Sequence, residues 1–184
     1  WTGVQPCALL THIPTSGNAQ PPNPNFRGPK MNSFIGIIRG CQDIIGTLIF
    51  GGVFERHPDL RTVCVEADAG WAPHYMYRAD HAYNRHRYWL PAGQALSRLP
   101  SEYFSENIYV TFQDDWNAFK QADHMNWHRL MWANDFPHSD STWPWSQEML
   151  AEHTAQLSAE QRRAILSQNV TDLYNIDVRT LAVA

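Results

Sequence analysis

The sequence predicts an α/β protein with a parallel sheet. Short apolar segments alternate with longer ones whose apolar residues recur at helical spacing, and four such pairs follow one another. This alternation is typical of parallel strands joined by helical crossovers. Each predicted strand also runs into polar residues, and ligands of parallel α/β proteins bind at the carboxyl ends of strands. The polar residues at the four strand ends are His12; Glu66 and Asp68; Gln113, Asp114 and Asp115; and Asn134 and Asp135.

The first predicted strand is Pro6 to His12, a mostly apolar run that ends in a histidine. Residues 14–29 are rich in Pro, Asn and Gly, which predicts a long loop. Residues 32–50 carry apolar side chains three and four positions apart, which predicts a helix. The second strand is Leu60 to Val65, and a helix is expected from Ala72 to Trp89.

The second half of the chain repeats the pattern. At the start of its last helix, Ser158 and Gln161 have the spacing of a capping box. The predicted elements are a short helical turn at 100–104, a strand at Ile108 to Phe112, a helix from Asp115 to His124, a strand at Arg129 to Ala133, and helices over 141–153 and 158–170.

Composition excludes several classes of function. Apolar residues make up 43% of the 184 residues, enough for a core of one domain or a large piece of one. The net charge is −4 without a Lys/Arg run, so we expect no nucleic-acid or anionic-membrane partner. The most apolar stretch, 34–50, contains Arg39 and Asp43, and we expect no membrane span.

The cysteines and the first residue give two further expectations. Cys7, Cys41 and Cys64 are isolated in apolar segments and are expected to be reduced core thiols, which favours a cytoplasmic protein. The sequence shows no signal peptide, and it enters an apolar run directly after Trp1, as if it started within a domain.

Four stretches resemble the amidohydrolase-related (amidohydrolase 2) family, which includes aminocarboxymuconate semialdehyde decarboxylase-like enzymes. The resemblance extends from about His12 to Ile176. It implies a partial (β/α)8 TIM barrel, approximately strands 5 to 8 with their helices. Residues 1–184 would be the carboxyl-terminal half of a metal-dependent hydrolase barrel, with 176–184 as a tail. The matching stretches are GGVFERHPDLRTVCVEADAGWAP (51–73), PSEYFSENIYVTFQDD (100–115), RLMWANDFPHSDSTWPWS (129–146) and QRRAILSQNVTDLYNI (161–176).

The resemblance implies a divalent metal at the strand ends, with zinc as the first expectation and manganese as the second. It implies a histidine ligand after the fifth strand, which His12 matches, and an aspartate after the eighth, which Asp135 matches. The family carries a His-x-His or Glu-x-His pair on its first strand, and no His-x-His occurs in this sequence. Because two donors hold a metal weakly, the chain alone is expected to be inactive.

Each candidate residue also has an ordinary structural interpretation. Asp135 could bind the metal and accept a proton from metal-bound water, or cap the turn at Pro137. His12 could be a ligand or a strand-end histidine bonded to its loop. Glu66 could be a general base or substrate contact, or the ion-pair partner of Arg61 or Arg78.

Three further features lie beside these candidates. His138 could contact a substrate oxygen or donate a hydrogen bond to Asp135. Asp68 is expected to be a turn residue that binds backbone amides. Trp116, Trp143 and Trp145 could wall a substrate pocket, or pack in the core or against another subunit.

The predicted function is that of a metal-dependent hydrolase acting on a small carbonyl or carboxylate substrate through metal-activated water. One alternative is a non-oxidative decarboxylase on the same frame, although the segment VEADAGW lacks the histidine that decarboxylases of this group carry after the sixth strand. The other is a catalytically incomplete half-barrel that packs with a partner, including a second copy of the chain. No G-x-G-x-x-G, P-loop or G-x-S-x-G motif supports another enzyme class.

Overall fold

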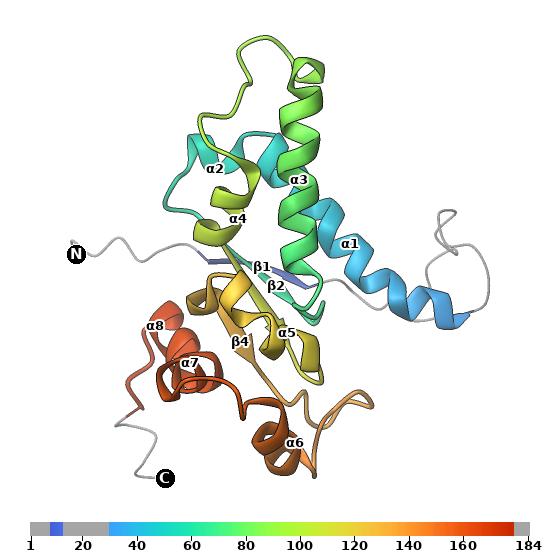
Figure 1. The fold of residues 1–184 in the computed structure, drawn as a ribbon, viewed down its shortest axis with the longest axis vertical. Helices are drawn as coiled ribbons and strands as arrows, with labels where there is room; N and C mark the ends of the chain where they lie inside the picture. The colour runs from blue at the N-terminus through green and yellow to red at the C-terminus, as the bar shows by residue number, and fades with distance from the viewer. Residues whose placement is uncertain (1–7, 13–29, 179–184) are drawn as a thin grey trace.

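The computed structural model describes residues 8–12 and 30–178, which form a four-stranded parallel sheet with helices packed on it (Figure 1). The strands lie side by side in chain order, so their carboxyl ends follow one another along one edge of the sheet. The predicted parallel α/β class is confirmed. The strands are β1 (Ala8–His12), β2 (Arg61–Val65), β3 (Ile108–Phe112) and β4 (Leu130–Trp132).

Helical segments connect each strand to the next. Between β1 and β2 lie α1 (Lys30–Phe50) and α2 (Val53–Arg56). Between β2 and β3 lie α3 (Ala72–His86), η1 (Arg87–Trp89) and α4 (Pro100–Asn107). Between β3 and β4 lie α5 (Trp116–Lys120), η2 (Ala122–His124) and η3 (Trp127–Arg129). After β4 come α6 (Ser146–His153), α7 (Ala159–Arg163), a π-helical turn (Ala164–Gln168) and α8 (Asn169–Tyr174).

Four predicted helices differ from the structure. The helix expected from Ala72 to Trp89 ends at His86 and is followed by η1, and the helix expected from Asp115 to His124 ends at Lys120 and is followed by η2. The helix expected over 141–153 begins only at Ser146, because Pro144 lacks an N–H and disfavours helical backbone at Trp143. The helix expected over 158–170 starts with the predicted capping box of Ser158 and Gln161, but it continues to Tyr174 through the π-helical turn. The loop expected at 14–29 lies outside the described residues.

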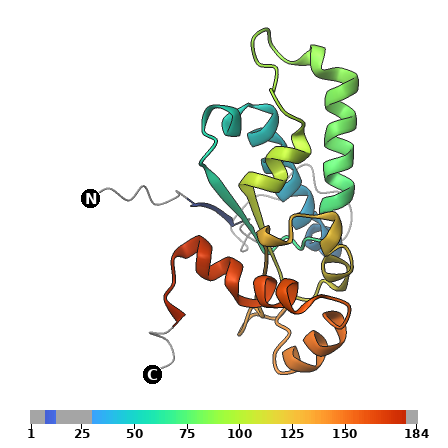
Figure 2. The same ribbon diagram turned by 60° about the vertical axis from the view of Figure 1, so that its left-hand side comes forward.

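The two faces of the sheet pack differently because side chains alternate along each strand. Cys64, Val110 and Leu130 belong to the large core cluster, which includes side chains from α1 to α6. The opposite face carries Val63, Tyr109 and Met131, which pack against Leu173 of α8. Figure 2 shows this arrangement, with α8 on one side of the strands and α1 and α3 on the other.

The cysteine expectation is wrong for two of the three residues. Cys41 of α1 and Cys64 of β2 are both buried, and the structure pairs them as a disulfide with a Cα–Cα separation of 6.6 Å. They are 23 residues apart, and only the packing of α1 onto β2 brings them together. Cys7 lies outside the described residues. The cysteines therefore give no support to a cytoplasmic location, which stays a prediction.

Two buried asparagines fix the backbone at the starts of strands. The amide nitrogen of Asn107 donates to the carbonyl oxygens of Pro58 and Leu60, at 2.8 and 2.9 Å, just before β2. The amide nitrogen of Asn169 donates to the carbonyl oxygens of Trp127 and Leu130, both at 2.7 Å, where β4 begins. These bonds give buried amide donors to carbonyl groups at the points where the strands begin.

We expect Asn169→Ala to lower the free energy of unfolding by about 1–3 kcal/mol, because it removes the side-chain donor of the Leu130 carbonyl oxygen, whereas the Trp127 carbonyl oxygen still accepts from the backbone N–H of Leu130. Urea unfolding of the two proteins measures the difference. Asn84→Ala, at an exposed position of α3, is the matched control and should cost under about 0.5 kcal/mol. Equal losses in the two variants would show that the buried amide does not hold the start of β4.

Candidate functional site at the carboxyl ends of the strands

Three acidic residues after the strands have left-handed backbone. Glu66, Asp68 and Asp135 have φ angles of 58°, 54° and 58°. The fourth non-glycine residue with positive φ in the described part of the chain, Asn175, ends α8. Left-handed backbone costs a non-glycine residue roughly 1–2 kcal/mol, and such residues cluster at functional sites. The sequence gives no signal of this, since acids after strands are also common in ordinary turns.

Fixed hydrogen bonds hold the turn after β2. The backbone N–H of Glu66 donates to the hydroxyl of Thr111 in β3 at 3.0 Å. The indole N–H of Trp71 donates to the carbonyl oxygens of Ala67 and Asp68, at 2.7 and 3.1 Å. The carboxylate of Asp115, after β3, accepts from the backbone N–H groups of Ala69 and Gly70, at 2.8 and 2.6 Å.

Asp68 lies in the turn after β2, as predicted, but it is not the residue that binds the backbone amides of Ala69 and Gly70. Asp115, not Asp68, binds the backbone amides of this turn. Burial raises the pKa of Asp68 to about 6, and the negative charges of Asp115, Asp140 and Asp114 add to the shift. A carboxyl group with this pKa exchanges its proton near neutral pH, which suits acid–base chemistry.

Asp135 and His138 meet in the turn after β4. The backbone N–H of His138 donates to the carbonyl oxygen of Asp135 at 2.8 Å, and His138 Nδ1 lies 3.0 Å from Asp135 Oδ2. The Asp135 side chain is 18% exposed and that of His138 is 55% exposed. Asp135 Oδ2 is fully buried, and among the described residues no donor is aligned to hydrogen-bond it. The two side chains lie close together, but the predicted hydrogen bond from His138 to Asp135 Oδ2 is not formed, so this oxygen keeps unused acceptor capacity.

The turn after β4 is also tied to the end of β3. The side-chain amide of Gln113 donates to Asp140 Oδ2 at 3.0 Å. Asp140 in turn contributes to the raised pKa of Asp68, which follows β2. Carboxylates that follow three strands are therefore electrostatically coupled.

His12 ends β1, as predicted, but its side chain lies outside what the structure describes. β1 and β4 are at opposite edges of the sheet, three strand spacings apart. At about 4.8 Å per spacing, a flat sheet would put their ends roughly 14 Å apart. A shared metal ion therefore requires a curved sheet with both side chains directed toward its concave side.

A groove of about 320 Å³ opens on the sheet face that α8 partly covers. Its walls are almost entirely apolar, and two of its lining residues adjoin the site: Thr111 bonds Glu66, and Ala133 precedes Asp135 by two positions. Val63, Val65 and Met131 form its floor, with Val170 and Tyr174 from α8. The groove is large enough for a small ligand.

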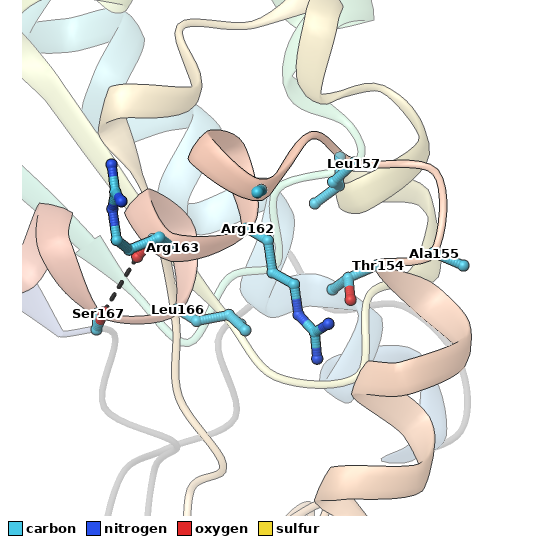
Figure 3. A pocket seen from close by; sticks show the side chains of 8 residues that line it. Thr154, Ala155, Leu157, Arg162, Arg163, Leu166 and Ser167 are labelled. Carbon is cyan, nitrogen blue, oxygen red and sulfur yellow. Dashed lines mark hydrogen bonds between the residues drawn. The ribbon is translucent and has the colours of Figure 1, made fainter.

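A wider hollow of about 550 Å³ lies beside α7 and shares no lining residue with the groove (Figure 3). Its lining includes Arg162, Arg163 and Ser167 but no carboxylate or histidine. Figure 3 shows Arg162 directed toward Thr154, whereas Arg163 turns away and accepts a hydrogen bond from Ser167 through its carbonyl oxygen. The hollow therefore lacks the residues for metal or acid–base chemistry.

The three tryptophans that were expected to line a pocket or pack in the core are exposed. Trp116, Trp143 and Trp145 are 53%, 57% and 69% exposed, so none packs in the core. Phe136, which follows Asp135 directly, makes an edge-to-face contact with Trp143 at a centroid distance of 5.0 Å. Aromatic side chains thus stand next to the Asp135 turn, where they could contact a substrate.

The polar residues at the carboxyl ends of the strands supply only part of a ligand set for a divalent metal. Asp135 Oδ2 is a buried oxygen that accepts no hydrogen bond from any described residue, as expected of a group that binds a cation. Within residues 8–12 and 30–178, however, no three candidate ligands with described side chains lie together. His12 is the donor that the topology places at the same edge of the sheet.

We expect Asp68→Asn to make stability less dependent on pH. The pKa of Asp68 is about 6 in the folded chain against 3.8 ordinarily, so the folded state binds its proton more tightly. Protonation of Asp68 therefore stabilises the folded state. This contribution is complete below about pH 4 and is lost as pH rises through 6. Asparagine tolerates left-handed backbone and does not ionise.

Urea unfolding at pH 4.5 and 7.5 tests this expectation. Relative to wild type, Asp68→Asn should gain about 1 kcal/mol at pH 7.5, a figure reduced for partial exposure to solvent. Asp114→Asn, at an exposed neighbouring acid, is the control and should gain less. Parallel pH profiles for wild type and Asp68→Asn would contradict the raised pKa.

The parallel strands, with coupled carboxylates at their carboxyl ends, define an α/β protein of the kind that binds ligands at strand ends. A family model described as amidohydrolase matches residues 39–176, which is most of the chain. The chain therefore belongs to the amidohydrolase family, as the sequence resemblance predicted. A search of curated proteins finds no match.

Solved structures with the same fold are longer than this chain. An amidohydrolase from Mycobacterium avium subsp. paratuberculosis K-10 is 21% identical with a TM-score of 0.65, and the match covers 83% of this chain and 37% of that one. The 5-carboxyvanillate decarboxylase of Sphingomonas paucimobilis is 21% identical with a TM-score of 0.59, covering 72% and 38%.

A third structure contains a metal and a ligand. The 5-carboxyvanillate decarboxylase of Novosphingobium aromaticivorans, complexed with manganese and 4-hydroxy-3-methoxy-5-nitrobenzoic acid, is 19% identical with a TM-score of 0.61, covering 76% and 40%. The present chain thus spans about two fifths of the solved structures that it matches.

Proposed function

We propose that the chain is the carboxyl-terminal half of a (β/α)8 barrel, with β1 to β4 as barrel strands 5 to 8. Coverage of about two fifths of the matching structures supports this assignment. The stepwise strand order supports it as well, because neighbouring strands of such a barrel follow one another in the chain. In the described residues β1 and β4 each pair on one side only, and a closed barrel would pair both with the missing strands.

We further propose that the whole protein is a metal-dependent, non-oxidative decarboxylase of a small aromatic carboxylic acid. The observation that carries this proposal is the apolar groove beside the strand-end carboxylates, which suits an aromatic ring next to a polar reacting group. Two of the similar structures are decarboxylases of 5-carboxyvanillate, and one of them holds a benzoic acid and manganese. The metal is proposed as manganese or zinc, with zinc resting on the sequence resemblance alone.

Each candidate residue has a defined part in this reaction. Asp135 and His12 would hold the metal, and the metal would polarise the oxygens of the substrate. His138 lies against Asp135 Oδ2 and would orient that carboxylate. Glu66 is proposed as a substrate contact or base, held in place through Thr111. As the C–C bond to the carboxylate breaks and CO2 leaves, Asp68 would donate a proton to the ring carbon and regain it from water.

Hydrolysis through metal-activated water is the second candidate. Glu66 stands where decarboxylases of this family carry a histidine, and a carboxylate can act as general base toward water. The two reactions share the metal and the rim but give different products. Hydrolysis of an amide or ester releases no CO2.

The assay that tests the proposal uses the full-length protein that contains this chain, loaded with manganese. The substrates are 5-carboxyvanillate and 2,6-dihydroxybenzoate labelled with ¹³C in the carboxyl group. We expect labelled CO2 and a product with one solvent hydrogen in place of the carboxylate. No release of CO2, together with turnover of an ester or amide panel, would favour the hydrolase instead.

A further inference from the structure

Asp115 joins the ends of β2 and β3. One of its carboxylate oxygens, Oδ2, accepts from the backbone N–H groups of Ala69 and Gly70 at 2.8 and 2.6 Å. The other oxygen, Oδ1, accepts from the N–H of Ala118 at 3.0 Å and caps the start of α5. A helix cap needs only one oxygen. The second oxygen is therefore used to hold the turn that follows β2.

Two further side chains bind the same turn through the carbonyl oxygen of Gly70. The carbonyl oxygen of Gly70 accepts from the side-chain amides of Asn117 and Gln121, at 2.9 and 3.1 Å. A side chain at Gly70 has no room, because a Cβ would lie 2.7 Å from both Asn117 Cβ and Asp115 Oδ1. The backbone of this turn and the start of α5 thus approach as closely as a glycine allows.

The held segment carries two acids of the candidate site. Its first residue, Glu66, is fixed to β3 through Thr111, and its last residues, Ala69 and Gly70, are fixed to Asp115. Asp68 lies between these anchors, and both Glu66 and Asp68 have left-handed backbone. Hydrogen bonds at both ends offset the conformational cost of keeping these residues in that region.

We propose that Asp115 is a positioning residue, which holds the turn after β2 so that Glu66 and Asp68 stay fixed at the strand-end rim. This inference deepens the proposed decarboxylase function and rests on it for the effect on catalysis. Asp115 itself touches no reacting atom in this account. It acts through the two backbone N–H groups that it binds.

The test compares three variants of the full-length protein. Asp115→Asn keeps one oxygen for the α5 cap but presents an NH2 group to the N–H donors of the turn. Gly70→Ala disturbs the same contact from the opposite side. Asp114→Asn is the matched control, because Asp114 is the exposed neighbour whose charge also acts on Asp68 but which makes none of these hydrogen bonds.

Amide hydrogen exchange tests the contact independently of activity. We expect exchange at Ala69 and Gly70 to rise at least about tenfold in Asp115→Asn, because both amides lose their acceptor. In Asp114→Asn these rates should stay within about twofold of wild type. Unchanged exchange in Asp115→Asn would overturn the proposal even if the protein proves to be a decarboxylase.

Kinetics test the consequence for the reaction. In Asp115→Asn and Gly70→Ala we expect kcat to fall about 100-fold with KM nearly unchanged, because the reacting groups are displaced while the groove stays intact. Both Asp→Asn variants remove a negative charge near Asp68, so both should move the pH dependence of kcat to lower pH, but only Asp115→Asn should lower its maximum.

The outcomes separate this proposal from the proposed function. A normal maximal kcat in Asp115→Asn, in an active protein, would overturn the positioning role. A wild-type protein that releases no CO2, but whose Ala69 and Gly70 amides depend on Asp115, would refute the decarboxylase and leave the contact established. Far-UV circular dichroism and thermal unfolding of each variant show whether a loss of activity reflects global unfolding.

Discussion

Replacement of Asp135 by asparagine is expected to lower metal affinity by at least about 100-fold and to abolish turnover. Changes in groups that merely orient a metal ligand already cost about 10–100-fold, and loss of the ligand charge should cost more. Asparagine keeps the size of the side chain and tolerates the φ of 58° at this position. The fold should therefore survive, and metal content after dialysis reports the loss directly.

Two companion variants identify the cause of that effect. His138→Gln should lower the metal affinity by only about 10–100-fold, because His138 contacts Asp135 from a partly exposed position. Asp140→Asn removes an exposed charge from the same turn and should leave metal binding within about threefold of wild type. Full metal occupancy in Asp135→Asn would remove Asp135 from the ligand set.

Phe112→Ala is expected to have the largest effect on stability, a loss of about 3–5 kcal/mol in the free energy of unfolding. Phe112 is the last residue of β3, has no exposed surface and packs edge-to-face on Phe119 at a centroid distance of 5.0 Å. Truncation removes this contact and leaves a cavity next to the segment that contains Gln113 and Asp115. Urea unfolding measures the change.

Phe136→Ala is the matched control for Phe112→Ala. Phe136 is 58% exposed, and its loss should cost under about 1 kcal/mol. Phe112→Leu fills most of the space and should cost less than the alanine variant. Similar losses for Phe112→Ala and Phe136→Ala would contradict the assigned core.

Local sequence patterns predict most of the strands and helices. The strands were predictable because they are short apolar runs that end in polar residues, and β3 has the predicted bounds of Ile108 to Phe112. The start of α6 was mispredicted because helical spacing continues through Pro144, which cannot join a helix interior. The π-helical turn after α7 and the pairing of Cys41 with Cys64 depend on tertiary contacts, so no local pattern indicates them.

The candidate site was only partly predictable. Neighbouring residues place Asp135 beside His138, and the structure brings their side chains within 3.0 Å. The roles of Asp68 and Asp115 could not be told apart in sequence, because each is an acid that follows a strand. Burial and like charges set the pKa of Asp68, while Asp115 reaches across 45 residues to Gly70.

The proposed metal site requires ligands from outside this chain. A metal held by His12 and Asp135 needs further donors, and the family resemblance assigns them to the first barrel strand. The coding sequence upstream of Trp1 should therefore encode a strand that ends in His-x-His or Glu-x-His. An upstream sequence without such a pair would leave the metal without a full set of ligands.

We propose that the carboxyl ends of β1 and β4 share one metal ion. The most direct measurement is a crystal structure of the full-length protein grown with manganese, with anomalous scattering recorded to locate the ion. We expect a single manganese peak within direct coordination distance of both Asp135 Oδ2 and an imidazole nitrogen of His12. A manganese ion bound elsewhere, or His12 and Asp135 directed to opposite faces of the sheet, would contradict the claim.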